Sequence, residues 1–204
     1  RHVAGMAELR RRVRAGELGE LQALDLVFHN AYGPDKGWCH DRRLAGGGCL
    51  LDLGVHLVDL ALWLQDSPVA AVTAADRYAQ GRRLPAGDAA LEDLAFASFR
   101  LANGACVRLA CSWHAQSGRD AIIELRAFGT RGGAVWRNVG GSFFDFELDL
   151  VRGPRSEALA RPPDAWGGRA LERWLEAVQV DPRFDPESAV HERVARLVDD
   201  LYRA

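Results

Sequence analysis

Polar and aromatic side chains recur at helical spacing within an otherwise apolar stretch of the sequence. If this stretch, Gly48 to about Gln65, is a helix with about 100° per residue, one narrow stripe holds Asp52, His56, Asp59 and Trp63. Leucine, valine and alanine fill most of the remaining wheel, so we expect a buried helix. A carboxylate and an imidazole four residues apart can hydrogen-bond, which fixes the imidazole tautomer and favours its protonated form. At a cavity wall, Asp52 and His56 could therefore move protons near neutral pH.

Other interpretations of this stripe stay open. It can be the solvent-facing edge of the helix, or a satisfied polar network that ties the helix to the sheet. Spacing alone favours such a purely structural role over a catalytic one. We expect Asp59 to belong to a network of this kind. A metal site would need a third ligand, such as His40 or His114, beside Asp52 and His56. No H-E-x-x-H or clustered-ligand pattern surrounds these residues, so no metal is expected.

Three glycines and a polar loop lead into the helix. Gly46, Gly47 and Gly48 offer a surface without side chains, where a substrate or cofactor can come close to the backbone beside a helix N-terminus. The preceding loop, residues 31–48, contains candidates for substrate contact that can equally be plain exposed loop residues: Lys36, Trp38, His40 and Arg43. For His29 and His114, on predicted strands, we expect ordinary sheet-face or interface roles.

The elements around this helix predict an α+β fold with a largely antiparallel, open-faced sheet and helices packed on one face. Alternating and apolar runs predict strands at Leu21–Asn30, Val69–Tyr78, Leu94–Leu101, Ala105–Trp113, Ala121–Phe128, Ala134–Trp136 and Phe143–Val151. Residues 79–91 are expected to be a loop. Further helices are predicted at Ala4–Ala15, Trp166–Val180 and Glu187–Tyr202, the last one beginning beside Asp185-Pro186.

The composition excludes some classes of binding partner. The 204 residues carry a net charge of −2, so there is no basic field to gather nucleic-acid or membrane phosphates, and the apolar runs fall short of a membrane span. Four cysteines without a C-x-x-C pair favour free thiols in a reducing cytoplasm. Cys106 and Cys111 should point to opposite faces of one strand. The sequence also contains neither G-x-G-x-x-G after a strand nor a P-loop, and hence no nucleotide fingerprint.

The stretch from Trp38 to Asp59, W-C-H-D-R-R-L-A-G-G-G-C-L-L-D-L-G-V-H-L-V-D, resembles the signature of the glucose-fructose oxidoreductase and inositol dehydrogenase family, often called Gfo/Idh/MocA. The resemblance covers most of the chain but only the C-terminal domain of these two-domain enzymes. It implies the dehydrogenase C-terminal domain fold, related to that of glyceraldehyde-3-phosphate dehydrogenase. Residues 1–204 would then be a substrate-binding and oligomerisation domain. By the resemblance, an N-terminal Rossmann domain that binds most of the NAD or NADP would be absent from the chain.

By this resemblance, His56 is the acid/base on a sugar, cyclitol or related polyol, and Asp52 positions the substrate or tunes the histidine. The isolated domain would be inactive, and copies would pair through the open sheet face into homodimers or homotetramers. One departure is Cys39, where the family commonly has an arginine, a charged fork that a thiol cannot replace. Two alternatives remain: a non-catalytic binding or assembly module, and a glycosidase-like relative that uses NAD transiently.

Overall fold

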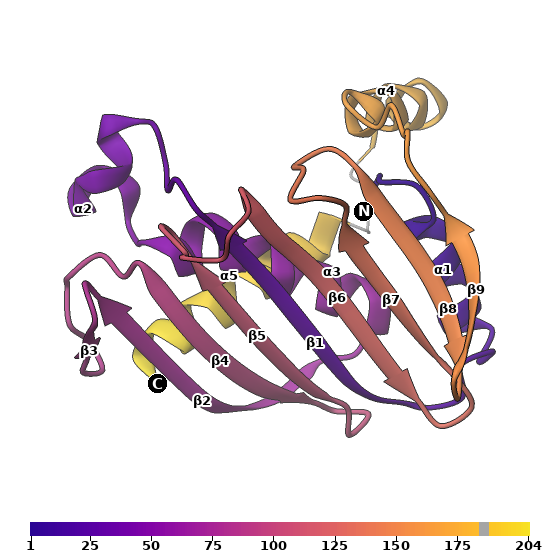
Figure 1. The fold of residues 1–204 in the computed structure, drawn as a ribbon, viewed down its shortest axis with the longest axis horizontal. Helices are drawn as coiled ribbons and strands as arrows, with labels where there is room; N and C mark the ends of the chain where they lie inside the picture. Colours follow the sequence, from indigo (N-terminus) through magenta and orange to yellow (C-terminus); the bar gives the residue numbers. More distant parts are fainter. Residues whose placement is uncertain (184–187) are drawn as a thin grey trace.

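A nine-stranded mixed sheet forms the body of the protein in the computed structural model, which describes residues 1–183 and 188–204 (Figure 1). The strand order is β3-β2-β4-β5-β1-β6-β7-β8-β9. The strands are β1 (Leu21–Asn30), β2 (Val69–Ala79), β3 (Arg82–Leu84), β4 (Leu94–Leu101), β5 (Cys106–Ser112), β6 (Ala121–Gly129), β7 (Gly133–Asn138), β8 (Phe146–Arg152) and β9 (Arg155–Ala160).

Only the pairing of β1 with β5 is parallel, with Leu26 opposite Leu109, and every other neighbouring pair is antiparallel. Between β1 and β5 the chain passes through the helical segment that ends in α3 and through the antiparallel strands β2, β3 and β4. This confirms the predicted α+β class and its largely antiparallel sheet.

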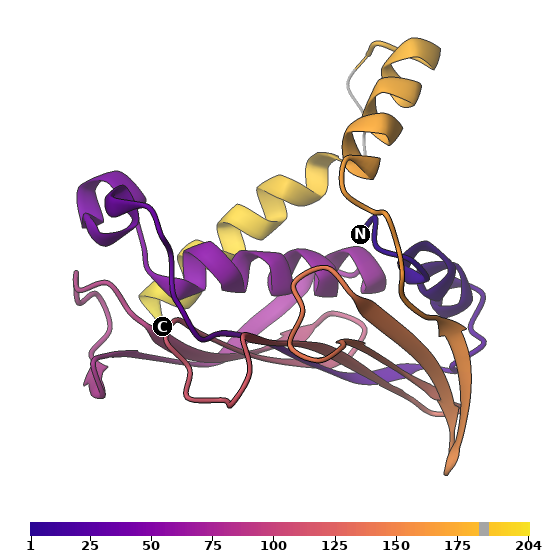
Figure 2. The same ribbon diagram turned by 45° about the horizontal axis from the view of Figure 1, so that its top comes forward.

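Helices cover one face of the sheet and leave the other open (Figure 2). The helix α3 (Val55–Gln65) lies across the central strands beside α5 (Ala189–Arg203), and α1 (Met6–Arg14) contacts α3. Alternation along the strands explains the sidedness: Leu24 and Leu26 of β1 are fully buried under the helices, whereas Asp25 between them is only partly buried. The core therefore sits between α3, α5 and the sheet.

One helix departs from the predicted layer. The helix α4 (Arg169–Val180) stands away from the body (Figure 2), and nearly all of its residues are exposed. It is therefore not among the helices that pack on the sheet.

The structure differs from the sequence predictions at short elements. Residues 79–91 contain the short strand β3, β9 was not predicted, and the loop at 31–48 contains the short helices η1 (Gly37–His40) and α2 (Arg42–Ala45). Elements of three to six residues carry too few apolar positions for periodicity to reveal them. The predicted Asp185-Pro186 helix start lies outside the described residues.

Within the described residues, one helical stretch, at 42–65, is long and apolar enough to cross a membrane by length and composition alone. Of its most apolar window, 67% is buried inside the fold. A core helix passes the same test, so this stretch is weak evidence for a membrane span.

Candidate active site

A wide helical turn opens the segment that carries the predicted acid/base pair. Residues Leu50–Gly54 form a π-helical turn, η2, that runs directly into α3. Such turns are rare and frequently lie at functional sites. Asp52 and His56 are both exposed, whereas Leu57 and Val58 face the core. The helix is therefore buried along most of its surface, as predicted, and presents its two candidate groups on the side that stays open.

Asp52 is held by an aromatic donor from the sheet. The indole Nε1 of Trp113 donates a hydrogen bond to Oδ2 of Asp52 at 2.8 Å. The ring of His40 meets the Trp113 ring edge-on, with centroids 6.2 Å apart. A residue directly after β5 and a residue of η1 thus meet at Asp52. The face of Trp113 agrees with the predicted alternation, since Val107, Leu109 and Cys111 are buried on the same side.

His56 has an aromatic neighbour rather than the expected carboxylate. Its ring lies 6.5 Å, centroid to centroid, from that of Phe28 on β1, tilted by 39°. Among the described residues no hydrogen bond joins His56 to Asp52, which corrects the expected contact between them. The wider winding of the π-helical turn changes the angular offset that four α-helical residues would give. The two groups are near neighbours on one helical segment with separate partners.

The other two residues of the stripe are structural. Asp59 accepts a hydrogen bond from Nε of Arg1 at 2.8 Å and forms an ion pair with it, which confirms its expected place in a network. The ring of Trp63 is mostly buried and lies under the guanidinium of Arg10, 4.6 Å from the ring centroid. The stripe is thus divided between a candidate site at its start and a packing contact at its end.

The loop residues also divide into one near the candidate site and others away from it. Of the predicted substrate contacts, only His40 meets the cluster around Asp52. Trp38 is 55% exposed, Lys36 pairs with the adjacent Asp35 at 3.1 Å, and Arg43 extends into solvent.

The residue at which this chain departs from the resembled signature, Cys39 in place of an arginine, faces the protein interior. Cys39 is buried, and the neighbouring Arg42 lies over the ring of Tyr202, 5.8 Å from its centroid. Among the described residues, no contact joins Arg42 or the solvent-exposed Arg43 to Asp52.

The three glycines have different surroundings. Gly46 is exposed and has a φ of 79°, a conformation that favours glycine. Gly47 and Gly48 are buried, and a Cβ on them would meet Tyr202 and Glu92. Their lack of side chains therefore makes room for the protein's own groups.

Sequence reasoning missed Glu92 and the contact that Trp113 makes. Glu92 is buried with no exposed surface, and it accepts backbone N–H groups at the start of this helix. The only signal for Glu92 was its place before a predicted strand, and nothing local indicates which distant backbone groups a carboxylate will meet.

Among the described residues, no hydrogen bond or ring contact joins His29 or His114 to Asp52 or His56. The Nδ1 of His29 hydrogen-bonds Oγ of Ser112 at 2.8 Å, and burial lowers the pKa of this imidazole. By alternation along β1, His29 lies on the open face of the sheet, as predicted. His114 has a φ of 60° and follows β5 instead of lying within it. Both line a surface cavity of about 410 Å³ on that side of the sheet.

The cysteines are free thiols in the structure. Cys106 is exposed and Cys111 buried, as their opposite positions on β5 predicted. Cys111 instead contacts Cys49 at the start of the helix, with Sγ atoms 3.9 Å apart, and burial raises the pKa of the Cys49 thiol. In the part of the chain that the structure describes, no group of three or more His, Cys, Asp or Glu is placed to hold a metal ion.

Comparison with solved structures shows where this fold occurs. Aldose-aldose oxidoreductase from Caulobacter crescentus, solved with glycerol, superposes with a TM-score of 0.76 at 21% identity, over 98% of this chain and 58% of that one. A 3-ketoreductase from Actinomadura kijaniata, solved with NADP and TDP-benzene, gives 0.74 at 17% identity, over 95% and 56%. These likenesses establish the fold.

Sequence comparison identifies the family. The chain is 30% identical over 142 residues to 1,5-anhydro-D-fructose reductase from Ensifer adhaerens, across 68% of this chain and 40% of that protein. The chain thus spans less than half of this relative's length. Residues 6–135 match the model of the GFO/IDH/MocA C-terminal domain. This protein therefore belongs to the GFO/IDH/MocA oxidoreductase family, and the chain carries that family's C-terminal domain.

Proposed function

We propose that this chain forms the substrate side of an NAD- or NADP-dependent oxidoreductase that acts on a sugar, cyclitol or related polyol. One observation carries the proposal: Asp52 and His56 are exposed on the open side of a helix that is otherwise buried in the core. Such a helix gives a precise frame for groups that must meet a substrate. Relatives that share the family or the fold are named for reactions on sugars, which favours this substrate class.

His56 is proposed as the acid/base. When the substrate is oxidised, a hydride leaves the carbinol carbon and the imidazole takes the hydroxyl proton, which leaves a carbonyl; in the reverse direction His56 returns that proton. Its exposed ring, backed by Phe28, leaves room for a substrate oxygen to approach.

Asp52 is proposed to orient the substrate. Its Oδ2 accepts the hydrogen bond from Trp113, whereas Oδ1 has no partner among the described residues. A free carboxylate oxygen beside a fixed one can accept a substrate hydroxyl. His40, whose ring packs on Trp113, is the loop residue best placed to add a contact. Lys36, Trp38 and Arg43 are proposed to reach the substrate from the exposed side of their loop.

NAD or NADP, when bound, would supply the hydride acceptor or donor. The exposed Gly46 turn fits the edge of such a site, because Gly46 itself carries no side chain. Gly47 and Gly48 follow that turn and are themselves buried. We propose that most of the cofactor site lies in a Rossmann domain outside this chain, and that residues 1–204 serve substrate binding and assembly.

The test is a steady-state assay of the whole protein with NAD and NADP against matched panels of aldoses, cyclitols and linear polyols. We expect nicotinamide-coupled turnover with at least one of these classes. The intact mass of the natively expressed protein should exceed 22.4 kDa by one further domain, on the order of 100 to 150 residues. A mass of 22.4 kDa, together with no coupled turnover, would favour a binding or assembly module instead.

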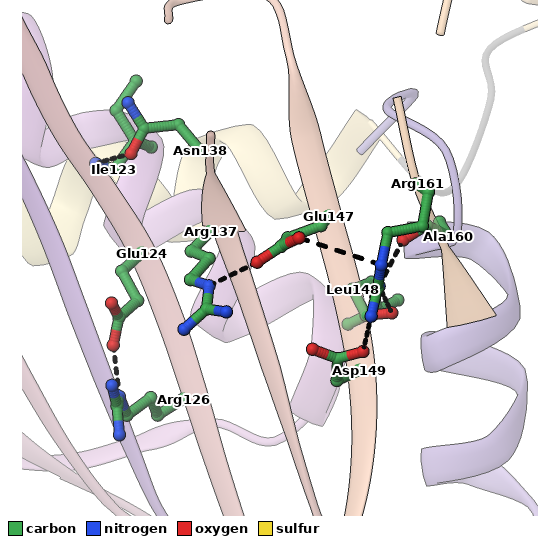
Figure 3. A network of polar contacts seen from close by, with 10 residues as sticks. All are labelled: Ile123, Glu124, Arg126, Arg137, Asn138, Glu147, Leu148, Asp149, Ala160 and Arg161. Carbon is green, nitrogen blue, oxygen red and sulfur yellow. Dashed lines mark hydrogen bonds and ion pairs between the residues drawn. The ribbon is translucent and has the colours of Figure 1, made fainter. Parts of the chain in front are cut away.

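The open sheet face is the proposed assembly surface (Figure 3). Two ion pairs lie on it: Arg137 donates to Glu147 at 2.6 Å, and Arg126 pairs with Glu124. Two large apolar side chains that alternation places on this face, Phe96 and Phe128, are 46% and 45% exposed. Paired charges are less costly to cover than isolated ones, so this face suits contact with a second copy.

We therefore expect the protein to be at least dimeric at micromolar concentration. Light scattering coupled to gel filtration should give a mass of two or more copies, and Phe96→Glu should shift the population toward the monomer by burying an unpaired charge. Phe144→Glu, at a phenylalanine that is 69% exposed in the turn before β8, is the control. A monomeric wild-type protein would contradict this assembly.

A further inference from the structure

The start of the helix that carries Asp52 and His56 is capped by a residue from a different part of the fold. Glu92, just before β4, has no exposed surface. Its Oε1 accepts the backbone N–H groups of Gly48 and Leu50, each at 3.0 Å, and its own carbonyl oxygen accepts the N–H of Cys49 at 2.9 Å. The first N–H groups of a helix have no partner inside it and are usually met by the side chain of the residue at its start. Gly48 has no side chain, so Glu92 instead accepts the hydrogen bonds of three successive backbone N–H groups.

Close approach explains the two buried glycines at this point. A Cβ on Gly48 would lie 2.1 Å from the carbonyl oxygen of Glu92, and one on Gly47 would lie 2.2 Å from the hydroxyl of Tyr202. Both distances are far inside van der Waals contact. The cap can therefore form only because neither position carries a side chain.

The C-terminal helix completes the arrangement. The hydroxyl of Tyr202, on α5, donates to the same Oε1 of Glu92 at 2.6 Å. Burial, together with the charge of Glu92, raises the pKa of Tyr202, so its hydroxyl remains a donor. The guanidinium of Arg77 lies 5.0 Å from the Tyr202 ring centroid, and that of Arg42 lies 5.8 Å from it. The two guanidinium groups thus pack on the ring whose hydroxyl donates to Glu92.

The cap is linked to the candidate site by one further step. The carbonyl of Gly48 accepts the backbone N–H of Asp52 at 3.0 Å, and the carboxylate of Asp52 accepts the indole of Trp113 at 2.8 Å. Fixing Gly48 therefore fixes the backbone from which Asp52 extends, and the π-helical turn runs from there into the start of α3, which carries His56.

We propose that Glu92 is a positioning residue. Together with Tyr202 it fixes the start of η2. It thereby holds Asp52 in contact with Trp113 and sets the orientation of His56 toward the site. This inference rests on the function proposed for Asp52 and His56, and it adds a residue that touches neither substrate nor cofactor. The carboxylate acts through the backbone, since it lies buried behind the glycine turn.

The test uses Glu92→Gln, which keeps the shape and one acceptor oxygen but removes the charge, in the whole protein. Because hydrogen bonds to a charged acceptor are the stronger ones, amide exchange in peptides spanning 46–52 should become about tenfold faster. The indole resonance of Trp113, assigned with Trp113→Phe in protein labelled with ¹⁵N-tryptophan, should shift. The resonances of the other tryptophans should not. Tyr202→Phe removes one hydrogen bond and should move both readouts in the same direction by less.

A matched control separates positioning from loss of stability. Leu148→Ala removes a fully buried side chain on β8, remote from the cap, and should lower the melting temperature without shifting the Trp113 resonance or selectively speeding exchange at 46–52. The proposal is overturned if Glu92→Gln leaves both readouts as in the wild type, or changes them only as Leu148→Ala does. Neither readout uses substrate or cofactor, so failure here is distinguishable from failure of the proposed reaction.

Discussion

His56→Ala is expected to lower kcat of the whole enzyme by about 10² to 10⁴-fold, the usual contribution of a positioned general acid/base. The substituted side chain is exposed and its ring contact is with a single neighbouring ring, that of Phe28. Proton transfer would be lost, whereas the helix and its buried face would remain. Steady-state kinetics with the best substrate from the panel provides the measurement.

Cofactor affinity should stay nearly unchanged in this variant, because the histidine is assigned to the substrate oxygen. Titration of NAD or NADP into His56→Ala, followed by protein fluorescence, checks this. His191→Ala, at an exposed histidine on α5, is the matched control and should keep wild-type kinetics. An undiminished kcat in His56→Ala would remove the acid/base role from His56.

Leu57→Ala should destabilise the protein by about 2 to 5 kcal/mol, the range for deleting a buried leucine side chain. Leu57 follows His56 directly but is only 2% exposed and belongs to the core between α3 and the sheet. The loss combines the transfer free energy of the removed carbons with the cavity that they leave. Chemical denaturation, with the midpoint and slope compared to wild type, measures it.

The same substitution at an exposed helical leucine gives the control. Leu44 of α2 is 67% exposed, so Leu44→Ala should change the free energy of unfolding by no more than about 0.5 kcal/mol. Equal stability of Leu57→Ala and Leu44→Ala would mean that α3 is rotated relative to the orientation described above.

The long elements could be predicted from the sequence. The strands β1 and β4 lie at the predicted residues, because their alternation of apolar and polar side chains is the period of a half-buried strand. The helix at 55–65 likewise follows from its apolar composition and from the proline after it. The two short strands β3 and β9 were missed, since they offer too few residues for a period.

Residue types and spacing also identified Asp52 and His56 as candidates for chemistry and placed both on one side of one helix. The contacts of these residues could not be predicted in this way. Trp113, which holds Asp52, lies 61 residues further along the chain, and its role depends on which strand passes beneath η2.

The glycines show the same division between local and distant information. From the sequence they predict a place where a substrate or cofactor approaches the backbone closely, whereas at Gly47 and Gly48 the groups that approach belong to the protein itself. That Glu92 and Tyr202 approach Gly47 and Gly48 was decided by the packing of β4 and α5 against the helix start. Local periodicity fixes secondary structure because it depends on neighbours along the chain. Hydrogen-bond partners of buried polar groups depend on the tertiary fold, because an unpaired buried donor is costly and takes whichever acceptor the packing brings to it.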